Sequence, residues 1–239
     1  MEPTIIYEDE AILAINKPSG LIVYPDGKHD YPALSTWLET RLDSTSSARR
    51  EKYGKDRFHF VHRIDRETSG ILLVAKTEAA HAFLKQQFAE RDIKKTYRAF
   101  VYGGLKDDRG IIERPIGSAR GGLGPRSATR PHGTTREAIT AYSVRARSSN
   151  PPGVNSATYV DVFPKTGRTH QIRVHFSAIQ HPVICDVLYA PTRAPLLGFK
   201  RLALHALSLT FTHPNGREVT LEAPLPTDFL AAEKELRKE

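Results

Sequence analysis

Two segments rich in apolar residues, Phe58–Val61 and Gly70–Ala75, flank a short charged stretch, and this arrangement constrains the fold more than any other feature. Apolar segments of this length predict buried strands. The stretch between them reads His62-Arg63-Ile64-Asp65-Arg66-Glu67-Thr68-Ser69-Gly70. We therefore expect a loop between two buried strands that presents Asp65, and such loops are where catalytic residues are often found.

Asp65 lies among cationic side chains in the sequence. Neighbouring positive charge favours the ionised form of a carboxylate, and an ionised aspartate can act as a nucleophile or a weak base. Arg63 and Arg66 are suited to gripping a phosphodiester. The residues alone leave open a second interpretation, in which Asp65 forms a structural ion pair with Arg63 or Arg66.

The chain carries an excess of positive charge. Lysine and arginine number 35 against 27 acidic residues, which gives a formal net charge of +8. Such an excess is typical of proteins that bind a polyanion, although a solvated basic surface has the same composition. Two basic segments near residues 44–57 and 118–131 are candidates for phosphate contact, and an ordinary solvated loop is the alternative for each.

The composition also indicates the cellular compartment. Cys185 is the single cysteine, so no internal disulfide can form and a reducing compartment is expected. The sequence has no apolar run of about 18 residues that could span a bilayer. Its first residues have neither a basic nor an apolar targeting region. We therefore expect a cytoplasmic monomer that does not bind membranes.

Four segments in order resemble the motifs of the RluA-type pseudouridine synthases, which isomerise uridine in RNA. They are Asn16-Lys17-Pro18-Ser19-Gly20-Leu21, the aspartate stretch 62–70, Lys95-Thr96-Tyr97-Arg98-Ala99 and Lys165-Thr166-Gly167-Arg168-Thr169-His170-Gln171-Ile172-Arg173-Val174-His175. One such segment is weakly specific, but four in register are hard to produce by chance. The resemblance implies an enzyme that acts on structured ribosomal or transfer RNA and flips the uridine from its stack.

The resemblance also implies roles for individual residues. Asp65 is the essential catalytic group, Tyr97 faces the base, and Arg173 pairs with Asp65. Arg63 can occupy the space that the flipped base leaves. The other substrate-binding candidates are His62, Arg66, Thr68, Lys165, Arg168, His170, Arg120, Arg126 and Arg130. From the residues alone, the cations can equally be solvated charge, and Tyr97 can be a buried strand residue.

Neither a cofactor nor a metal is expected at this site. Isomerisation within a nucleotide consumes no redox equivalent and no phosphate, and the sequence lacks the glycine-rich motifs that bind nucleotide cofactors. His62, His170 and His175 lack the spacing of a metal site. The sequence therefore predicts cofactor-free chemistry.

Two other functions fit parts of the sequence. A non-catalytic RNA-binding or RNA-remodelling protein could have the same fold, but it would not need Asp65, Tyr97 and Arg173 together. An aspartate-dependent glycosidase normally uses two carboxylates. Glu67 is the nearby acid, and on an extended loop its side chain would diverge from that of Asp65.

The predicted elements indicate an α+β fold. Strands joined by turns favour a largely antiparallel sheet, and the resemblance implies a bent mixed sheet with flanking helices and a central RNA-binding cleft. We predict helices over 34–42, after a cap at Thr77, and from a cap at Thr169 to Ile179. We also predict a strand over 136–144.

The domain organisation follows from the extent of the motifs. The catalytic domain is expected over residues 1–226, with the basic insertions inside it. Because the motifs begin near Ile5, the family's common N-terminal RNA-binding appendage is not expected. Residues 227–239 read as a charged helical tail that frays.

Overall fold

The computed structural model describes residues 2–25, 27, 30–43, 58–119, 126–148 and 156–236. The chain divides into two compact units. The first unit comprises residues 1–94 and 208–224, and the second comprises residues 95–207 and 225–239. The basic insertion 44–57 and Arg120 lie outside the described residues.

The first unit is built on antiparallel strands. They are β1 (Thr4–Glu8), β2 (Ile12–Lys17), β3 (His59–Phe60), β4 (Ser69–Ala75) and β13 (Glu218–Glu222). β2 pairs with β1 and β4, and β3 pairs with the end of β4. Every residue of β4 is buried, as the apolar run predicted. The strand therefore gives the Asp65 loop a fixed base.

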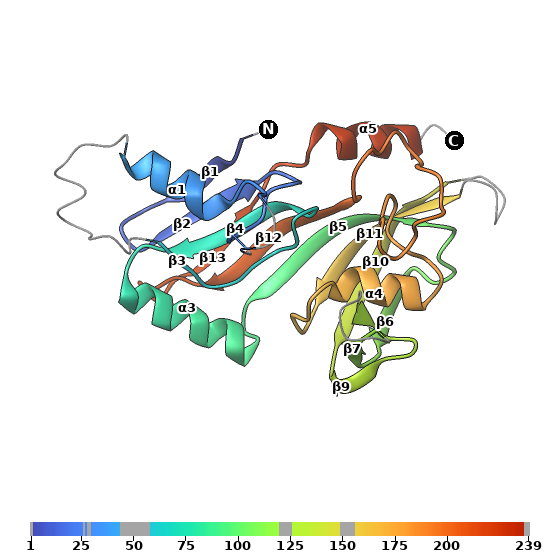
Figure 1. Cartoon of the computed structure of the whole chain (residues 1–239), viewed down its shortest axis with the longest axis horizontal. Coiled ribbons are helices and arrows are strands. Elements are labelled where there is room, and N and C mark those ends of the chain that lie inside the picture. Colours follow the sequence, from blue (N-terminus) through green and yellow to red (C-terminus); the bar gives the residue numbers. More distant parts are fainter. Residues whose placement is uncertain are drawn as a thin grey trace. The chain divides into compact units, whose positions relative to one another are not determined.

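Within the described residues, the first unit contains the helices α1 (Leu34–Asp43) and α3 (Glu78–Glu90), and both were predicted. The Thr77 hydroxyl accepts a hydrogen bond from the Ala80 N–H at 3.1 Å and caps α3. α3 packs along β3 and β4 (Figure 1). The helix thus lies against the strands on either side of the Asp65 loop.

The second unit contains a larger antiparallel arrangement and a small sheet. Its strands are β5 (Lys94–Tyr102), β6 (Arg109–Glu113), β10 (Ile139–Arg147), β11 (Ala157–Pro164) and, in the small sheet, β7 (Ile116–Ser118), β8 (Arg126–Ser127) and β9 (His132–Arg136). The order is β5-β11-β10-β6 in one and β8-β7-β9 in the other. β12 (Leu204–Thr212) begins in this unit and ends in the first, where it pairs with β13.

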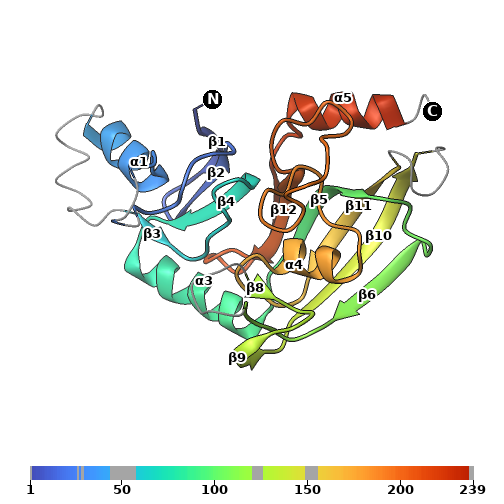
Figure 2. The same ribbon diagram turned by 45° about the vertical axis from the view of Figure 1, so that its right-hand side comes forward.

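Helices α4 (Gln171–Ala178) and α5 (Thr227–Leu236) complete the second unit. Figure 2 shows α4 lying against β10 and β11. The core centres on Phe100, whose ring stacks on Tyr159 at 4.2 Å between centroids. Phe229 of α5 is fully buried in this core. The expected C-terminal helix thus packs on this core through its apolar face, and its fraying stays a prediction.

The fold class predicted from the sequence is confirmed, since helices accompany mostly antiparallel strands. The strand expected over 136–144 is confirmed for residues 139–144, which belong to β10, but its start is wrong because Arg136 ends another strand, β9. Arg136 pairs with Ile116 in the small sheet, whereas Ile139 pairs with Glu113. The central RNA-binding cleft stays a prediction. No helix within the described ranges is long and apolar enough to cross a membrane.

Candidate active site

Asp65 lies on the loop between β3 and β4, where the flanking strands placed it. The Thr68 N–H donates to the Asp65 carbonyl at 3.1 Å and closes a tight turn. Ile64 and Thr68 are buried on either side of the turn, Arg63 is exposed, and Asp65 itself is half-buried. The turn is thus anchored at both ends while the aspartate stays accessible.

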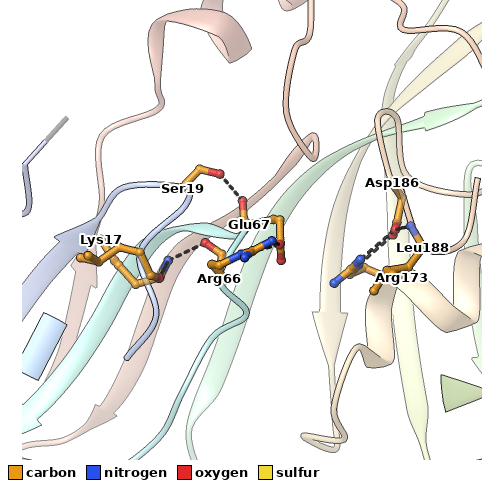
Figure 3. A network of polar contacts seen from close by, with 8 residues as sticks. Lys17, Ser19, Arg66, Glu67, Arg173, Asp186 and Leu188 are labelled. Carbon is orange, nitrogen blue, oxygen red and sulfur yellow. Dashed lines mark hydrogen bonds and ion pairs between the residues drawn. The ribbon is translucent and has the colours of Figure 1, made fainter. Parts of the chain in front are cut away.

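A buried lysine fastens this turn to the end of β2. Lys17 has no exposed surface, and its ammonium donates to the carbonyls of Arg66 at 3.1 Å, Pro18 at 2.9 Å and Leu21 at 2.8 Å (Figure 3). An ammonium has three donors, and a buried charge is costly unless it is hydrogen-bonded. The Asp65 turn and the segment 16–21 therefore hold each other in place.

Two further bonds join the same segments. The Ser19 hydroxyl donates to the Glu67 carbonyl at 2.6 Å, and the Gly20 N–H donates to the Arg66 carbonyl at 2.8 Å. Gly20 has φ +92°, a conformation that side-chain-bearing residues adopt with strain. Two of the four sequence motifs thus form one hydrogen-bonded body.

The carboxylate of Glu67, the acid closest to Asp65 in the chain, forms an ion pair with Arg66. Glu67 accepts from the Arg66 guanidinium at 2.6 Å and 2.8 Å, and the same guanidinium lies 4.1 Å above the Tyr31 ring. A glycosidase would need a second carboxylate free for proton transfer. The ion pair with Arg66 leaves Glu67 poorly suited to that task.

His62 makes contacts that support the loop. Its Nε2 accepts the Leu73 N–H at 2.9 Å, and its ring stacks on Phe88 of α3 at 4.6 Å. An imidazole that accepts a backbone N–H through Nε2 is unprotonated at that atom. These contacts give His62 a structural use, and its predicted substrate contact stays a prediction.

Tyr97 lies in β5 of the second unit, opposite Val162 of β11. Its side chain is half-buried and packs against the core cluster around Phe100. A tyrosine held in a strand in this way has few accessible rotamers. The ring can therefore present a fixed face to a ligand.

Arg173 in α4 forms a buried, bidentate ion pair. Its Nε and Nη2 lie 2.7 Å and 2.8 Å from the carboxylate oxygens of Asp186, and the two side chains are 1% and 0% exposed (Figure 3). Asp186 also accepts the N–H groups of Leu188 at 3.0 Å and Tyr189 at 3.2 Å. The guanidinium is thus oriented by Asp186, and its predicted pairing with Asp65 stays a prediction.

The start of α4 differs from the prediction. The expected cap at Thr169 is wrong, because the helix begins at Gln171 after His170, which has a left-handed φ of 56° and makes no side-chain cap. The Gln171 side-chain oxygen instead accepts the Thr166 hydroxyl at 2.7 Å and the Arg168 N–H at 3.0 Å. This amide organises the loop that carries the predicted phosphate ligands.

His175 is fully buried in α4. Its Nε2 donates to the Arg114 carbonyl at 3.0 Å, and its Nδ1 faces the Thr140 hydroxyl at 2.9 Å. Burial lowers the pKa of the His175 imidazole, because the charged form loses its hydration. Both ring nitrogens are therefore engaged inside the fold, which gives this motif residue a structural use.

This burial predicts a pH dependence of stability. Below about pH 6.5 the imidazole binds a proton more readily in the unfolded chain than in the native chain, where its pKa is lowered. The free energy of unfolding should therefore decrease as the pH is lowered from about 6.5 towards the native pKa, by up to about 1.4 kcal/mol per pH unit for this one group. Urea unfolding between pH 7.5 and 5.5 should show that the free energy of unfolding changes less with pH in His175→Gln than in wild type. An equal pH dependence in the two proteins would show that other groups cause it.

The cationic candidates of the second unit are linked by a chain of contacts. The Arg126 N–H donates to the Tyr189 hydroxyl at 2.9 Å, and that hydroxyl lies 3.0 Å from His170 Nδ1. Arg168 donates to the Glu137 carbonyl at 3.1 Å. The exposed side chains among these candidates are those of Lys165, Arg126 and Arg130. Tyr189 therefore links β8 of the small sheet to His170 at the start of α4.

Three positioning residues were missed from the sequence: Gln171, Asp186 and Tyr189. Gln171 stood inside a motif but carried no charge. Asp186 and Tyr189 fall in a segment without a recognisable pattern, and only the fold brings them to α4.

Comparison with known proteins decides the family. Residues 11–178 match the model of the RNA pseudouridylate synthase family. The chain belongs to this family. The RluA-type resemblance is confirmed by the dual-specificity RNA pseudouridine synthase RluA of Pasteurella multocida, which is 37% identical over 92% of each chain. Pseudouridine synthases are isomerases that convert uridine to pseudouridine in RNA, so the predicted activity class is confirmed.

Two further proteins extend the comparison. Ribosomal large subunit pseudouridine synthase D of Neisseria meningitidis is 35% identical to this chain. The match covers 94% of this chain and 59% of the Neisseria protein. The solved structure of human RNA Pseudouridylate Synthase Domain Containing 4 shares 26% identity, with a TM-score of 0.73 over 98% of this chain and 92% of the other. The α+β fold is thus that of a pseudouridine synthase.

Proposed function

We propose that this pseudouridine synthase isomerises uridines in structured ribosomal or transfer RNA, with Asp65 as its catalytic group and no cofactor. The observation that supports this most is the fastening of the Asp65 turn by Lys17 and Ser19. A catalytic carboxylate must be held within a fraction of an ångström of its working position. A loop fixed by buried hydrogen bonds meets that need.

The reaction requires a small set of events. The bond between the sugar and N1 of uracil breaks, the base rotates in the site, and the sugar bonds to C5, whose proton is released while N1 gains one. Asp65 serves this chemistry either by attack on the nucleoside or by a step at the sugar, and both uses need its ionised form. Tyr97 stacks on the base, and Arg173, oriented by Asp186, stabilises negative charge.

The RNA class rests on the relatives. One is named for the large ribosomal subunit and another for dual specificity. Purified protein should be incubated with ribosomal RNA and transfer RNA that lack pseudouridine, followed by mapping of the modified positions. Pseudouridine at discrete sites in either RNA supports the proposal, and none in both would contradict it.

Tyr97→Phe should keep the stacking face and remove the hydroxyl. If the hydroxyl transfers a proton, single-turnover rates should fall by about 10²-fold or more while RNA affinity is unchanged. Tyr7→Phe, which removes a hydroxyl from β1, is the control and should keep the wild-type rate. A wild-type rate for Tyr97→Phe would leave Tyr97 a packing role alone.

The small sheet should bind phosphates. Arg126 in β8 and Arg130 in the turn between β8 and β9 are exposed, and Ala128 between them is buried against Ile116 and Val174, which fixes the segment to α4. Replacing both arginines by Gln should weaken RNA binding and flatten its salt dependence by up to about one unit of slope per lost phosphate contact. Affinity measured across a salt series tests this.

The control for that experiment is Arg217→Gln, an exposed arginine in the turn between β12 and β13 of the first unit. It changes the net charge without touching the small sheet. An unchanged slope in the Arg126/Arg130 variant would make the small sheet solvated surface. If Arg217→Gln lowers the salt dependence by half as much as the double variant does, the effect is one of net charge and not of a phosphate contact at the small sheet.

A further inference from the structure

The first unit brings two histidines and a glutamate together on α3 and β3, away from the four motifs. His59 comes from β3, and Glu78 and His81 come from the first turns of α3. One ligand atom of each side chain lies within 4.8 Å of the others. No sequence motif marks this group, because His59 lies 19 residues before Glu78 in the chain and only the fold brings them together.

We propose that His59, Glu78 and His81 form a binding site for a divalent transition metal, with Zn²⁺ as the ion that fits best. Glu78 and His81 are three residues apart, so they share one face of the helix. Two imidazole nitrogens and one carboxylate oxygen are a common zinc ligand set that leaves the fourth position to water. Mg²⁺ and Ca²⁺ prefer all-oxygen sites and fit poorly.

The distances suit such an ion. His59 Nε2 and Glu78 Oε1 are 3.6 Å apart, and ligand atoms around a tetrahedral zinc at about 2.0–2.2 Å lie roughly 3.3 Å from one another. The two imidazole rings stack with centroids 5.2 Å apart. The Glu78 side chain is 82% exposed and free to turn, whereas that of His59 is 16% exposed. Small side-chain rotations would therefore complete the site.

The site has a structural consequence. β3 has only two residues, and it leads directly into the Asp65 loop. His62 of that loop already stacks on Phe88 of α3. A metal that joins His59 to Glu78 and His81 would tie β3 to the same helix a second time. The proposed metal thus stabilises the base of the loop and takes no part in the chemistry at Asp65.

Isothermal titration of the metal-free full chain with Zn²⁺ alone tests the site. We expect one ion bound per chain, and at least about a 10-fold loss of affinity in His81→Gln and in His59→Gln, the smallest loss typical of disturbed metal sites. His132→Gln, at an exposed histidine in β9 of the second unit, is the control and should bind like wild type. Unchanged affinity in both site variants, or no binding by wild type, would overturn the proposal.

Two further measurements distinguish the loss of the metal site from misfolding of a variant. A hundredfold excess of Zn²⁺ over its dissociation constant should raise the melting midpoint of wild type by about 5 °C, and that of His81→Gln by much less. Co²⁺ alone added to wild type should produce a visible d–d absorption that Zn²⁺ removes. A midpoint that rises equally in both proteins, or no such absorption, would contradict the site without reference to any variant's fold.

Discussion

Asp65→Asn should abolish isomerisation while RNA binding persists. The substitution keeps the size and shape of the side chain, replaces one accepting oxygen with an NH2 donor, and removes the charge that either route requires. The turn around Asp65 should stay intact, because the bonds that hold it run from Lys17, Ser19 and Gly20 to backbone carbonyls. We expect single-turnover rates to fall by about 10³-fold or more, as for other essential catalytic groups.

The matched control is Asp92→Asn, which makes the same chemical change at an exposed residue of the first unit. It should keep the wild-type rate. RNA affinity measured beside the rates separates loss of catalysis from loss of binding. An Asp65→Asn variant with a rate within about tenfold of wild type would show that the carboxylate is not the essential group.

Breaking the buried ion pair of Arg173 and Asp186 should destabilise the protein strongly. Asp186→Asn would remove the charge of the bidentate partner from a guanidinium that is 1% exposed. Removing one partner of a buried pair typically costs about 3–5 kcal/mol, because a desolvated charge loses compensation. Urea unfolding should show a loss of this size. Asp228→Asn is the control, since its bidentate pair with Arg201 is 21% and 30% exposed and should contribute much less.

A double variant separates the structural use of this pair from its use in catalysis. In Arg173→Met with Asp186→Asn, the buried guanidinium charge is gone and the amide still accepts the N–H groups of Leu188 and Tyr189. Stability should largely recover. If Arg173 also acts on the reacting nucleotide, turnover stays lost. Recovery of both stability and turnover would make Arg173 a structural residue.

Local patterns predicted the scaffold of the Asp65 loop well. An apolar run such as β4 can hardly be anything but a buried strand, and Thr77 caps α3 through the interaction that its residue type favours. These features depend on neighbours in the chain. The start of α4 was mispredicted because a distant contact decides it: Gln171 bonds to Ile139 and Thr140 of β10 as well as to its own loop.

Contacts between residues far apart in the chain could not be predicted from the sequence. Asp186 contacts Arg173, and His59 stacks on His81, only because the chain folds back. A single sequence carries no record of such pairings. Conversely, Lys17 looked like a turn residue, and its full burial under three carbonyls became visible only in the structure. The motifs thus predicted which residues act, while the contacts that orient these side chains required the fold.

We expect this chain to make pseudouridine in cellular RNA through Asp65. The most direct test maps pseudouridine in total RNA from cells without the gene, and from the same cells carrying either the wild-type gene or the Asp65→Asn gene. We predict that one or a few positions in ribosomal or transfer RNA lose pseudouridine without the gene, regain it with wild type, and stay unmodified with Asp65→Asn at equal protein levels. Identical maps in all cells, or restoration by Asp65→Asn, would contradict the claim.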